Sequence, residues 1–234
     1  KRETEGGRSL LLAIMLIFCI FGAVVYAVSQ KITREMSDAA IQNVSESLDL
    51  IQCTIETILR NEAEFQTLIA QELSRAEDPE VYVRAYQRNS IIAKMSFIPS
   101  GAAEGLSNTG ERFTEEDLDF SAGGTVSGLP VSQSYLNHLG TWAYTIKCPV
   151  ERDGAVLGTL YIEYIYDTID RSLPSDGFYN KQATLYIMDA QSERFVLKPK
   201  GMGMRDAGHL NLEDFYRANN IQDPDTRANV AQCL

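Results

Sequence analysis

Hydrophobic and polar residues form two successive helical patterns in the N-terminal part of the chain. No charged residue occurs from Ser9 to Gln30, and the run from Leu10 to Val28 is almost entirely apolar. A helix of this length, at about 1.5 Å per residue, spans the roughly 30 Å hydrocarbon core of a bilayer. We therefore expect a short N-terminal segment, residues 1–8, and a membrane-spanning helix, residues 9–30. A signal peptide and a buried core helix are the alternatives, but the run exceeds a signal-peptide core and continues into a polar helical pattern.

After this run the pattern becomes amphipathic. Residues 29–75 contain no proline or glycine. Apolar residues recur at alternating steps of three and four, interrupted only at Glu62, and they are Ile41, Val44, Leu48, Ile51, Ile55, Ile58, Phe65 and Ile69. This period is typical of an amphipathic or coiled-coil helix. We expect a long stalk helix over residues 31–76, whose stripe packs either on a sheet of its own domain or on a second copy of the chain.

Further along, the pattern predicts an antiparallel sheet. Asp78-Pro79 ends the stalk, and a short second helix follows to about residue 88. A β-rich run covers residues 91–98, and the strongest strands, 142–150 and 156–165, flank Asp153-Gly154. Asp-Gly between two such runs is typical of a hairpin. A two-residue loop would place Tyr144 opposite Glu163 and Ile146 opposite Tyr161.

The remaining segments complete an α+β fold. Residues 110–138 are rich in glycine and serine, with a helical turn at 114–118, and residues 167–182 read as a polar linker. A second hairpin is expected over 183–199, with helical patterns at 212–218 and from about residue 225. We expect a membrane-distal PAS-like sheet lobe, residues 77–176, and the start of a smaller membrane-proximal lobe, residues 177–234, which reads as incomplete.

Charge and cysteine content narrow the classes of partner. The chain has 21 basic and 32 acidic residues and a formal net charge of −11, which disfavours binding to nucleic acid or anionic lipid. Its four cysteines, Cys19, Cys53, Cys148 and Cys233, are far apart, and only two histidines are present. No metal-ligand spacing occurs, so no metal site is predicted. Free thiols and a single disulfide both remain open.

One face of the predicted hairpin collects aromatic side chains around a carboxylate. The candidate ligand-binding residues are Trp142, Tyr144, Tyr161 and Glu163, together with Tyr135 from the preceding segment. An aromatic box closed by a carboxylate suits an amine or amino acid, through cation–π attraction and a charged hydrogen bond. The alternative is that the aromatic residues are core and that Glu163 is solvated at the sheet edge.

No pattern supports catalysis or a cofactor. The chain has no Gly-x-Ser-x-Gly, Walker or Cys-x-x-Cys motif. The glycine-containing run Lys200–Met204 lacks the spacing and the following Lys-Ser/Thr of a phosphate loop. The acidic cluster Glu115–Asp117 is an ordinary helix start. We therefore expect no enzymatic activity in this part of the protein.

The order of these features resembles the Cache sensors, the PAS-like extracytoplasmic domains of bacterial transmembrane receptors. The resemblance rests on the membrane helix, the stalk and the strand pair Tyr144–Val150 and Asp153–Leu160, with its hydrophobic-Pro-Val, Asp-Gly and small-Gly-hydrophobic steps. Leu185–Asp189 with Phe195–Pro199 is similar to the opening hairpin of the second lobe in double-Cache sensors. The resemblance covers most of residues 29–200.

The resemblance implies a cytoplasmic N-terminus, an extracytoplasmic sensor, a second membrane span beyond this sequence and a cytoplasmic output domain. A hybrid histidine kinase is the first expectation for the output, with a diguanylate cyclase or a chemotaxis receptor as alternatives. The apolar stripe of the stalk gives the further expectation of a homodimer formed through the stalk. In amino-acid-binding members an arginine and a tryptophan precede the strand; Trp142 matches the tryptophan, but no arginine lies between Thr114 and Lys147. A structural or adhesive ectodomain is the alternative of another class.

Overall fold

The structure is a computed structural model. It describes residues 2–86, 92–118, 120–121, 123–173, 187–191, 194–197, 212–218 and 220–232. In the first helix, side chains are described at position 15 and from position 18 onward. The chain forms two units, residues 1–52 and residues 53–234.

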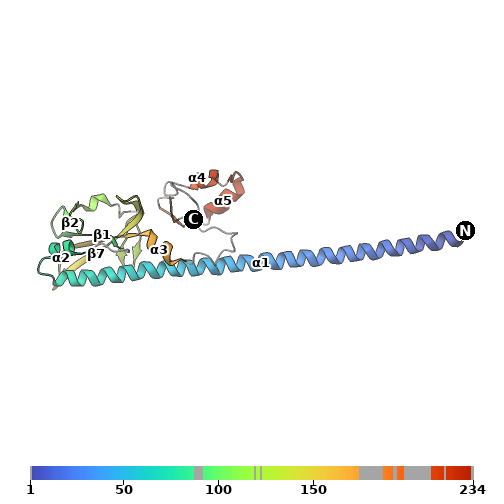
Figure 1. Cartoon of the computed structure of the whole chain (residues 1–234), viewed down its shortest axis with the longest axis horizontal. Coiled ribbons are helices and arrows are strands. Elements are labelled where there is room, and N and C mark those ends of the chain that lie inside the picture. Colours follow the sequence, from blue (N-terminus) through green and yellow to red (C-terminus); the bar gives the residue numbers. More distant parts are fainter. Residues whose placement is uncertain are drawn as a thin grey trace. The chain divides into compact units, whose positions relative to one another are not determined.

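A single helix, α1 (Arg2–Arg75), covers both helical patterns of the N-terminal part (Figure 1). Its continuity follows from the absence of proline throughout and of glycine after Gly22. Within the residues that were described, no helix is long and apolar enough to cross a membrane. The predicted span includes side chains at positions 9–14, 16 and 17, which lie outside the described part of the chain.

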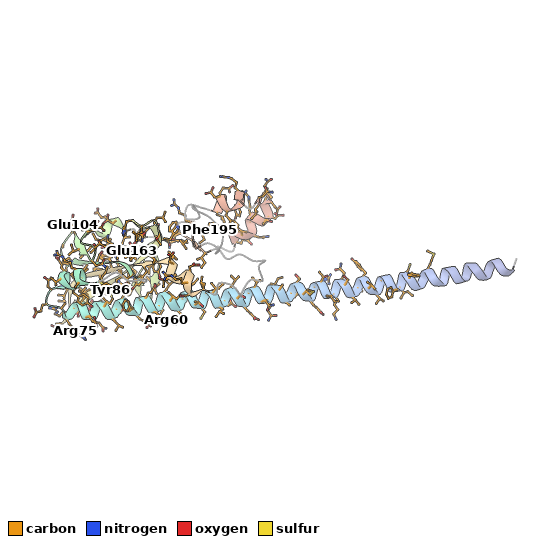
Figure 2. All side chains as sticks on the ribbon, viewed as in Figure 1. Arg60, Arg75, Tyr86, Glu104, Glu163 and Phe195 are labelled. Atoms are coloured by element: carbon orange, nitrogen blue, oxygen red, sulfur yellow. The ribbon has the colours of Figure 1, made fainter. Side chains whose placement is uncertain are left out.

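The last part of α1 packs against the sheet of its own lobe, in the segment bracketed by Arg60 and Arg75 in Figure 2. The helix residues buried there are Glu62, Ala63, Gln66, Ile69, Ala70 and Leu73. Further toward the N-terminus, Ile41, Val44 and Leu48 are exposed. The predicted stripe therefore packs on its own sheet at one end, whereas Ile41, Val44 and Leu48 toward its other end are exposed among the described residues.

The turn after α1 is built as its sequence indicates. Asp78 caps the short helix α2 (Pro79–Ala85), because its Oδ1 accepts hydrogen bonds from the backbone N–H groups of Glu80 and Val81. Arg152, near the end of a central strand, donates to the backbone carbonyls of Ser74 and Ala76. These contacts join the end of α1 to the sheet.

The sheet is antiparallel and six-stranded in the described part of the chain. Its strand order is β3 (Arg112–Phe113), β2 (Gly105–Ser107), β1 (Ile92–Pro99), β8 (Ala155–Ile165), β7 (Trp142–Arg152) and β6 (Tyr135–Leu136). The long central strands β1, β8 and β7 are mostly buried. This curled sheet with helices confirms the predicted α+β, PAS-like fold class at the level of the sheet lobe.

The central hairpin begins as predicted and then departs from the predicted register. At the turn, Asp153 and Gly154 both have positive φ, 53° and 80°, and Arg152 pairs with Ala155. Between Val150 and its neighbour Glu151 the register shifts by one residue. Such a β-bulge opposes two residues of one strand to one of the other and reverses the faces beyond it.

The predicted cross-strand pairs are therefore wrong. Tyr144 pairs with Tyr164 rather than with Glu163, and Ile146 pairs with Ile162. Since alternate residues of a strand point to opposite faces, Tyr144 lies on the face covered by α1 and Glu163 on the other face. The aromatic residues that were expected on one face are divided between two.

Short elements surround the sheet. The 3-10 helix η1 (Glu115–Asp117) and the hairpin of β4 (Thr125–Val126) and β5 (Leu129–Pro130) lie in the segment between β3 and β6. The helix α3 (Tyr166–Ser172) replaces the beginning of the predicted polar linker. Residues 174–182 of that linker and the predicted lobe boundary at 176/177 lie outside the described residues.

The C-terminal part of the chain, for which a second lobe was predicted, is described in four pieces. They are β9 (Ile187–Asp189), β10 (Arg194–Leu197), α4 (Leu212–Ala218) and α5 (Pro224–Gln232). β9 and β10 form the predicted second hairpin, over a shorter range than expected. Phe195 of β10 packs against Phe215 of α4, with ring centroids 5.5 Å apart. The backbone N–H of Ser134 donates to the Asp189 carboxylate at 2.9 Å, which joins β9 to the sheet lobe.

The cysteines described are free thiols. Cys19 and Cys53 are exposed and Cys148 is buried, while Cys233 lies outside the described residues. Burial raises the pKa of the Cys148 thiol above its usual range, so this group stays protonated near neutral pH.

Candidate functional site

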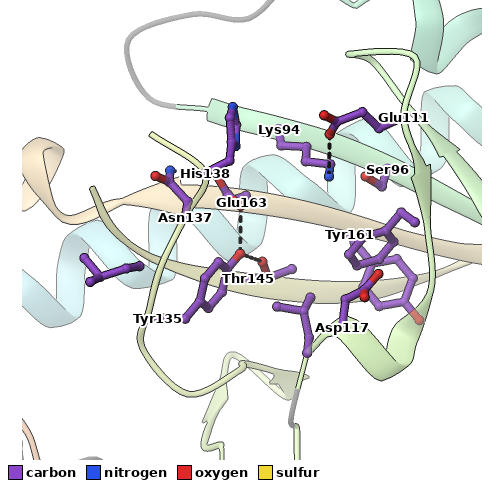
Figure 3. Close-up of a pocket in the computed structure, with 13 residues that line it drawn as sticks. Lys94, Ser96, Glu111, Asp117, Tyr135, Asn137, His138, Thr145, Tyr161 and Glu163 are labelled. Carbon is purple, nitrogen blue, oxygen red and sulfur yellow. Dashed lines mark hydrogen bonds and ion pairs between the residues drawn. The ribbon is translucent and has the colours of Figure 1, made fainter. Parts of the chain in front are cut away.

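A pocket of about 220 Å³ lies on the sheet face opposite α1 (Figure 3). Its floor is formed by β1, β7 and β8, and the segments around η1 and β6 close its sides. The residues that line it are Lys94, Ser96, Glu111, Phe113, Asp117, Leu118, Tyr135, Leu136, Asn137, His138, Thr145, Tyr161 and Glu163. It thus combines an aromatic wall with a small number of charged groups, as ligand pockets commonly do.

Glu163 is the buried carboxylate of this pocket, with 8% of its surface exposed. Its Oε2 accepts a hydrogen bond from the Tyr135 hydroxyl at 2.9 Å, and its Oε1 accepts one from the Asn137 amide at 3.0 Å. Both carboxylate oxygens therefore have donors, which is what a buried negative charge requires. These two hydrogen bonds fix the orientation of the Glu163 carboxylate.

The two donors are themselves held in place. The Asn137 Oδ1 accepts from the backbone N–H groups of Leu139 and Thr141, both at 3.0 Å, which turns the amide nitrogen toward Glu163. The Tyr135 hydroxyl also bonds the Thr145 hydroxyl at 2.6 Å. Burial, followed by the negative charge of Glu163, holds the pKa of Tyr135 well above its usual range, so the phenol remains a donor.

Lys94 lies across the pocket from this cluster. Its ammonium group, with 17% of the side chain exposed, is 3.1 Å from the Glu111 carboxylate and 5.5 Å from the centre of the Phe113 ring. The hydrogen bond and charge of Lys94 lower the pKa of Glu111, so the Glu111 carboxylate is ionised at neutral pH. Counting Asp117 and Glu163, the lining has more acidic than basic groups.

Aromatic residues close the end of the pocket near η1. The Tyr161 ring meets that of Phe113 edge to face, with centroids 5.1 Å apart, and lies 6.1 Å from that of Phe120. Lys147 pairs with Glu115 and lies 4.7 Å from the Phe120 ring centre. These contacts fasten the segment that carries η1 onto the sheet and place the Tyr161 ring at the pocket wall.

The structure brings three of the five predicted site residues together. Tyr135, Tyr161 and Glu163 line the pocket. Tyr144 lies on the opposite face, where its hydroxyl donates to the Glu62 carboxylate of α1. Trp142 shares the face of Tyr144 by strand alternation and is outside the pocket lining. The predicted residues are divided between the two faces because the bulge lies between the turn and the site and shifts the register by one residue.

The prediction missed most of the polar residues that line the pocket, among them Lys94, Ser96 and Asn137. Lys94 and Ser96 interrupt an apolar strand at alternate positions, which is a signal that one face of β1 is polar. Asn137 lies in a connection of varied composition, where no periodic pattern points to it. In the described residues no group of three or more His, Cys, Asp or Glu side chains could hold a metal ion.

Comparison with known proteins identifies the fold through structure alone. No protein-family model and no curated protein matches the sequence. The chain is similar to the solved sensory domain of the Campylobacter jejuni chemoreceptor Tlp3 with isoleucine bound, at 11% identity and a TM-score of 0.56, over 79% of this chain and 81% of that one. The ligand-binding domain of the same chemoreceptor in complex with L-norvaline gives 14% identity and a TM-score of 0.50, over 78% of each chain.

The fold is thus that of sensory ligand-binding domains of bacterial chemoreceptors, as the Cache resemblance implied. A further Tlp3 sensory-domain structure agrees, at 12% identity and a TM-score of 0.52. At these identities the likeness concerns the fold, and the names of these solved structures describe sensory domains rather than enzymes.

Proposed function

We propose that this chain is the extracytoplasmic ligand-sensing region of a membrane-bound bacterial signalling receptor. In this proposal the apolar run at 9–30 anchors the chain in the membrane, and the sheet lobe binds a small molecule outside the cytoplasm. The observation that carries the proposal is the buried Glu163 carboxylate in the pocket on the sheet, held by Tyr135 and Asn137.

The proposed ligand carries an ammonium group, as amines and amino acids do. Glu163 would accept a hydrogen bond from the cation, and the Tyr161 ring would face its apolar part. Lys94 offers a partner for a ligand carboxylate, although Glu111 already occupies it. The excess of acidic groups therefore favours an amine over an amino acid, whereas the solved neighbours include domains with isoleucine and L-norvaline bound.

The proposed receptor acts as a homodimer through α1 and passes its signal to a cytoplasmic domain. The exposed apolar positions Ile41, Val44 and Leu48 support the dimer. For the output, the similarity to chemoreceptor sensory domains supports a chemotaxis receptor. A hybrid histidine kinase and a diguanylate cyclase are the other candidate output domains. The sequence encoded downstream of this chain would distinguish the three.

Calorimetric titration of the chain with amines and L-amino acids tests the pocket. We expect a primary amine or amino acid to bind the wild type and to bind Glu163→Gln about 10- to 100-fold more weakly, because a buried charge-assisted hydrogen bond is lost. Glu151→Gln, an exposed glutamate of the same hairpin, is the matched control and should leave the affinity unchanged.

A second arm uses the ligand instead of the protein, so that it does not depend on how a variant folds. The analogue in which a hydroxyl replaces the ammonium group should lose binding to the wild type by a similar factor. Equal binding of the two analogues would exclude recognition by Glu163. Absence of binding by every amine and amino acid would favour the structural or adhesive ectodomain.

A further inference from the structure

Glu62 is a buried carboxylate on the other face of the same sheet. It lies on α1, at the position where the apolar stripe is interrupted, and has 6% of its surface exposed. The Tyr144 hydroxyl donates to its Oε2, and the Tyr164 hydroxyl donates to its backbone carbonyl at 3.1 Å. Both tyrosines belong to the central strands β7 and β8, so this one residue ties the helix to both strands that carry the pocket.

Among the residues that the structure describes, the groups that face Glu62 carry no positive charge. They are the tyrosine hydroxyls of Tyr144 on β7, Tyr164 on β8 and Tyr166 on α3, and burial raises the pKa of each. The neighbouring ionisable residues on α1 itself, Arg60 and Glu64, are exposed. Among the described residues Glu62 forms no ion pair, and its Oε1 has no hydrogen-bond partner.

This arrangement differs from that of Glu163. Glu163 has a donor on each oxygen, whereas Glu62 has a donor on one. A carboxylate that is desolvated without a cation favours its neutral form. Burial accordingly raises the pKa of Glu62 to about 7, and the hydrogen bond from Tyr144 opposes the rise.

The two sides of the sheet are connected through single strands. On β7, Tyr144 contacts Glu62 while the next residue, Thr145, bonds Tyr135 in the pocket. On β8, Tyr164 bonds the helix while its neighbour Glu163 forms the pocket floor. A change in how α1 packs against these strands therefore acts on residues adjacent to the ligand pocket.

We propose that Glu62 is a proton-binding site beneath the sheet, through which the surrounding pH sets how tightly α1 packs against β7 and β8. With the proton bound, the helix face is neutral and no charge is buried in the interface. When the proton leaves, a negative charge without a cation partner is buried between the helix and the sheet, which weakens their packing. The site is separate from the ligand pocket and does not require that the pocket bind an amine.

The direction of the pH effect follows from the two states of the protein. Below pH 4.5 Glu62 is protonated in the folded and the unfolded chain alike. Between pH 4.5 and about 7 the folded chain keeps the proton while the unfolded chain loses it, so stability falls as the pH rises. Above this window both states are ionised and the loss is complete.

Thermal denaturation of the full chain in detergent, from about pH 5 to pH 8, tests the proposal without any ligand. Glu62→Gln imitates the neutral acid, so we expect its midpoint to match the wild type at pH 5 and to exceed it by roughly 5 °C at pH 8. Glu64→Gln, an exposed glutamate two positions away, should follow the wild-type profile. Parallel profiles of wild type and Glu62→Gln would overturn the proposal.

Infrared titration supplies a readout that does not depend on the folding of Glu62→Gln. The carbonyl band of a protonated carboxylic acid should disappear with a midpoint near pH 7 in the wild type. Tyr144→Phe removes the hydrogen bond that favours the ionised form, so its midpoint should lie higher than that of the wild type. A wild-type midpoint near pH 4.5, or an unchanged midpoint in Tyr144→Phe, would contradict the assignment.

Discussion

Gln66 is a polar side chain with no exposed surface on the helix face that packs against the sheet. Its amide nitrogen donates to the backbone carbonyls of Ile146 at 2.8 Å and Leu160 at 3.1 Å, one on each central strand. Together with Glu62, one helical turn away, it makes this part of the helix–sheet interface polar and specific in register. Apolar side chains could pack there, but they would not fix which turn of α1 faces which strand pair.

Replacing Gln66 tests this role. Gln66→Leu keeps the approximate volume and removes two donors, so we expect a loss of about 1 to 2 kcal/mol in the free energy of unfolding and a midpoint lower by about 2 to 8 °C. Gln71→Leu, at an exposed position of the same helix, should change the midpoint little. Similar midpoints for the two variants would show that the buried amide contributes nothing to stability.

At the scale of the elements, the contact between β1 and β8 depends on a glycine beside the bulge. Gly158 pairs with Pro99 of β1 and with Val150 of β7. A Cβ atom there would lie 2.3 Å from the Ile98 carbonyl oxygen and 2.6 Å from the Phe97 ring. The backbone of β1 would have to move, so the position admits no side chain without rearrangement of the sheet.

Gly158→Ala should therefore destabilise the sheet lobe by about 2 kcal/mol or more, measured by denaturant unfolding. Gly124→Ala is the control, because a Cβ atom at Gly124 meets nothing within 4 Å and the backbone there needs no positive φ. If the two substitutions had equal cost, the close approach of β1 to β8 would not exist in solution.

The elements also show what the sequence could and could not predict. Thr114 and Asp117 marked a real helix start, and the Asp153-Gly154 turn was predicted correctly, because each depends on a few neighbouring residues. The side-chain faces beyond the bulge were wrong, because a one-residue register shift leaves composition and periodicity unchanged. Tyr135, Tyr161 and the pocket carboxylate were found by residue type, whereas Asn137 depends on a contact between distant segments.

For the whole molecule, α1 is the element shared by the two units. Its end carries the sheet lobe through buried contacts, and its middle exposes apolar residues, with Val44 43% and Leu48 48% exposed. In the proposed receptor these uncovered positions pair with a second chain, so that a change at the sheet reaches the partner through one continuous helix. Ser134, bonded to Asp189 and to Tyr166, connects the segment before β6 to β9 and α3.

Sedimentation of the full chain tests the dimer. Val44→Glu places a charge in the stripe and should weaken self-association by at least about tenfold, while leaving ligand binding by the sheet lobe unchanged. Asn43→Glu introduces the same charge about 100° around the helix and should associate as the wild type does. Monomeric wild type, or equal association of both variants, would contradict the stripe as an interface.

The bulge between Val150 and Glu151 has a consequence for how such sensors diversify. Side chains alternate between the two faces of a strand, so whether the number of residues between the turn and the site is odd or even decides which side chains face the ligand. A single-codon insertion or deletion in this hairpin therefore moves the side chains beyond it from one face to the other. Homologous sheets with matching residues at aligned positions would then present different pockets. Ligand specificity in such a lineage can therefore change through a one-residue insertion or deletion as well as through substitution. The role of a residue can be transferred between relatives only when both have an even, or both an odd, number of residues between the turn and the site.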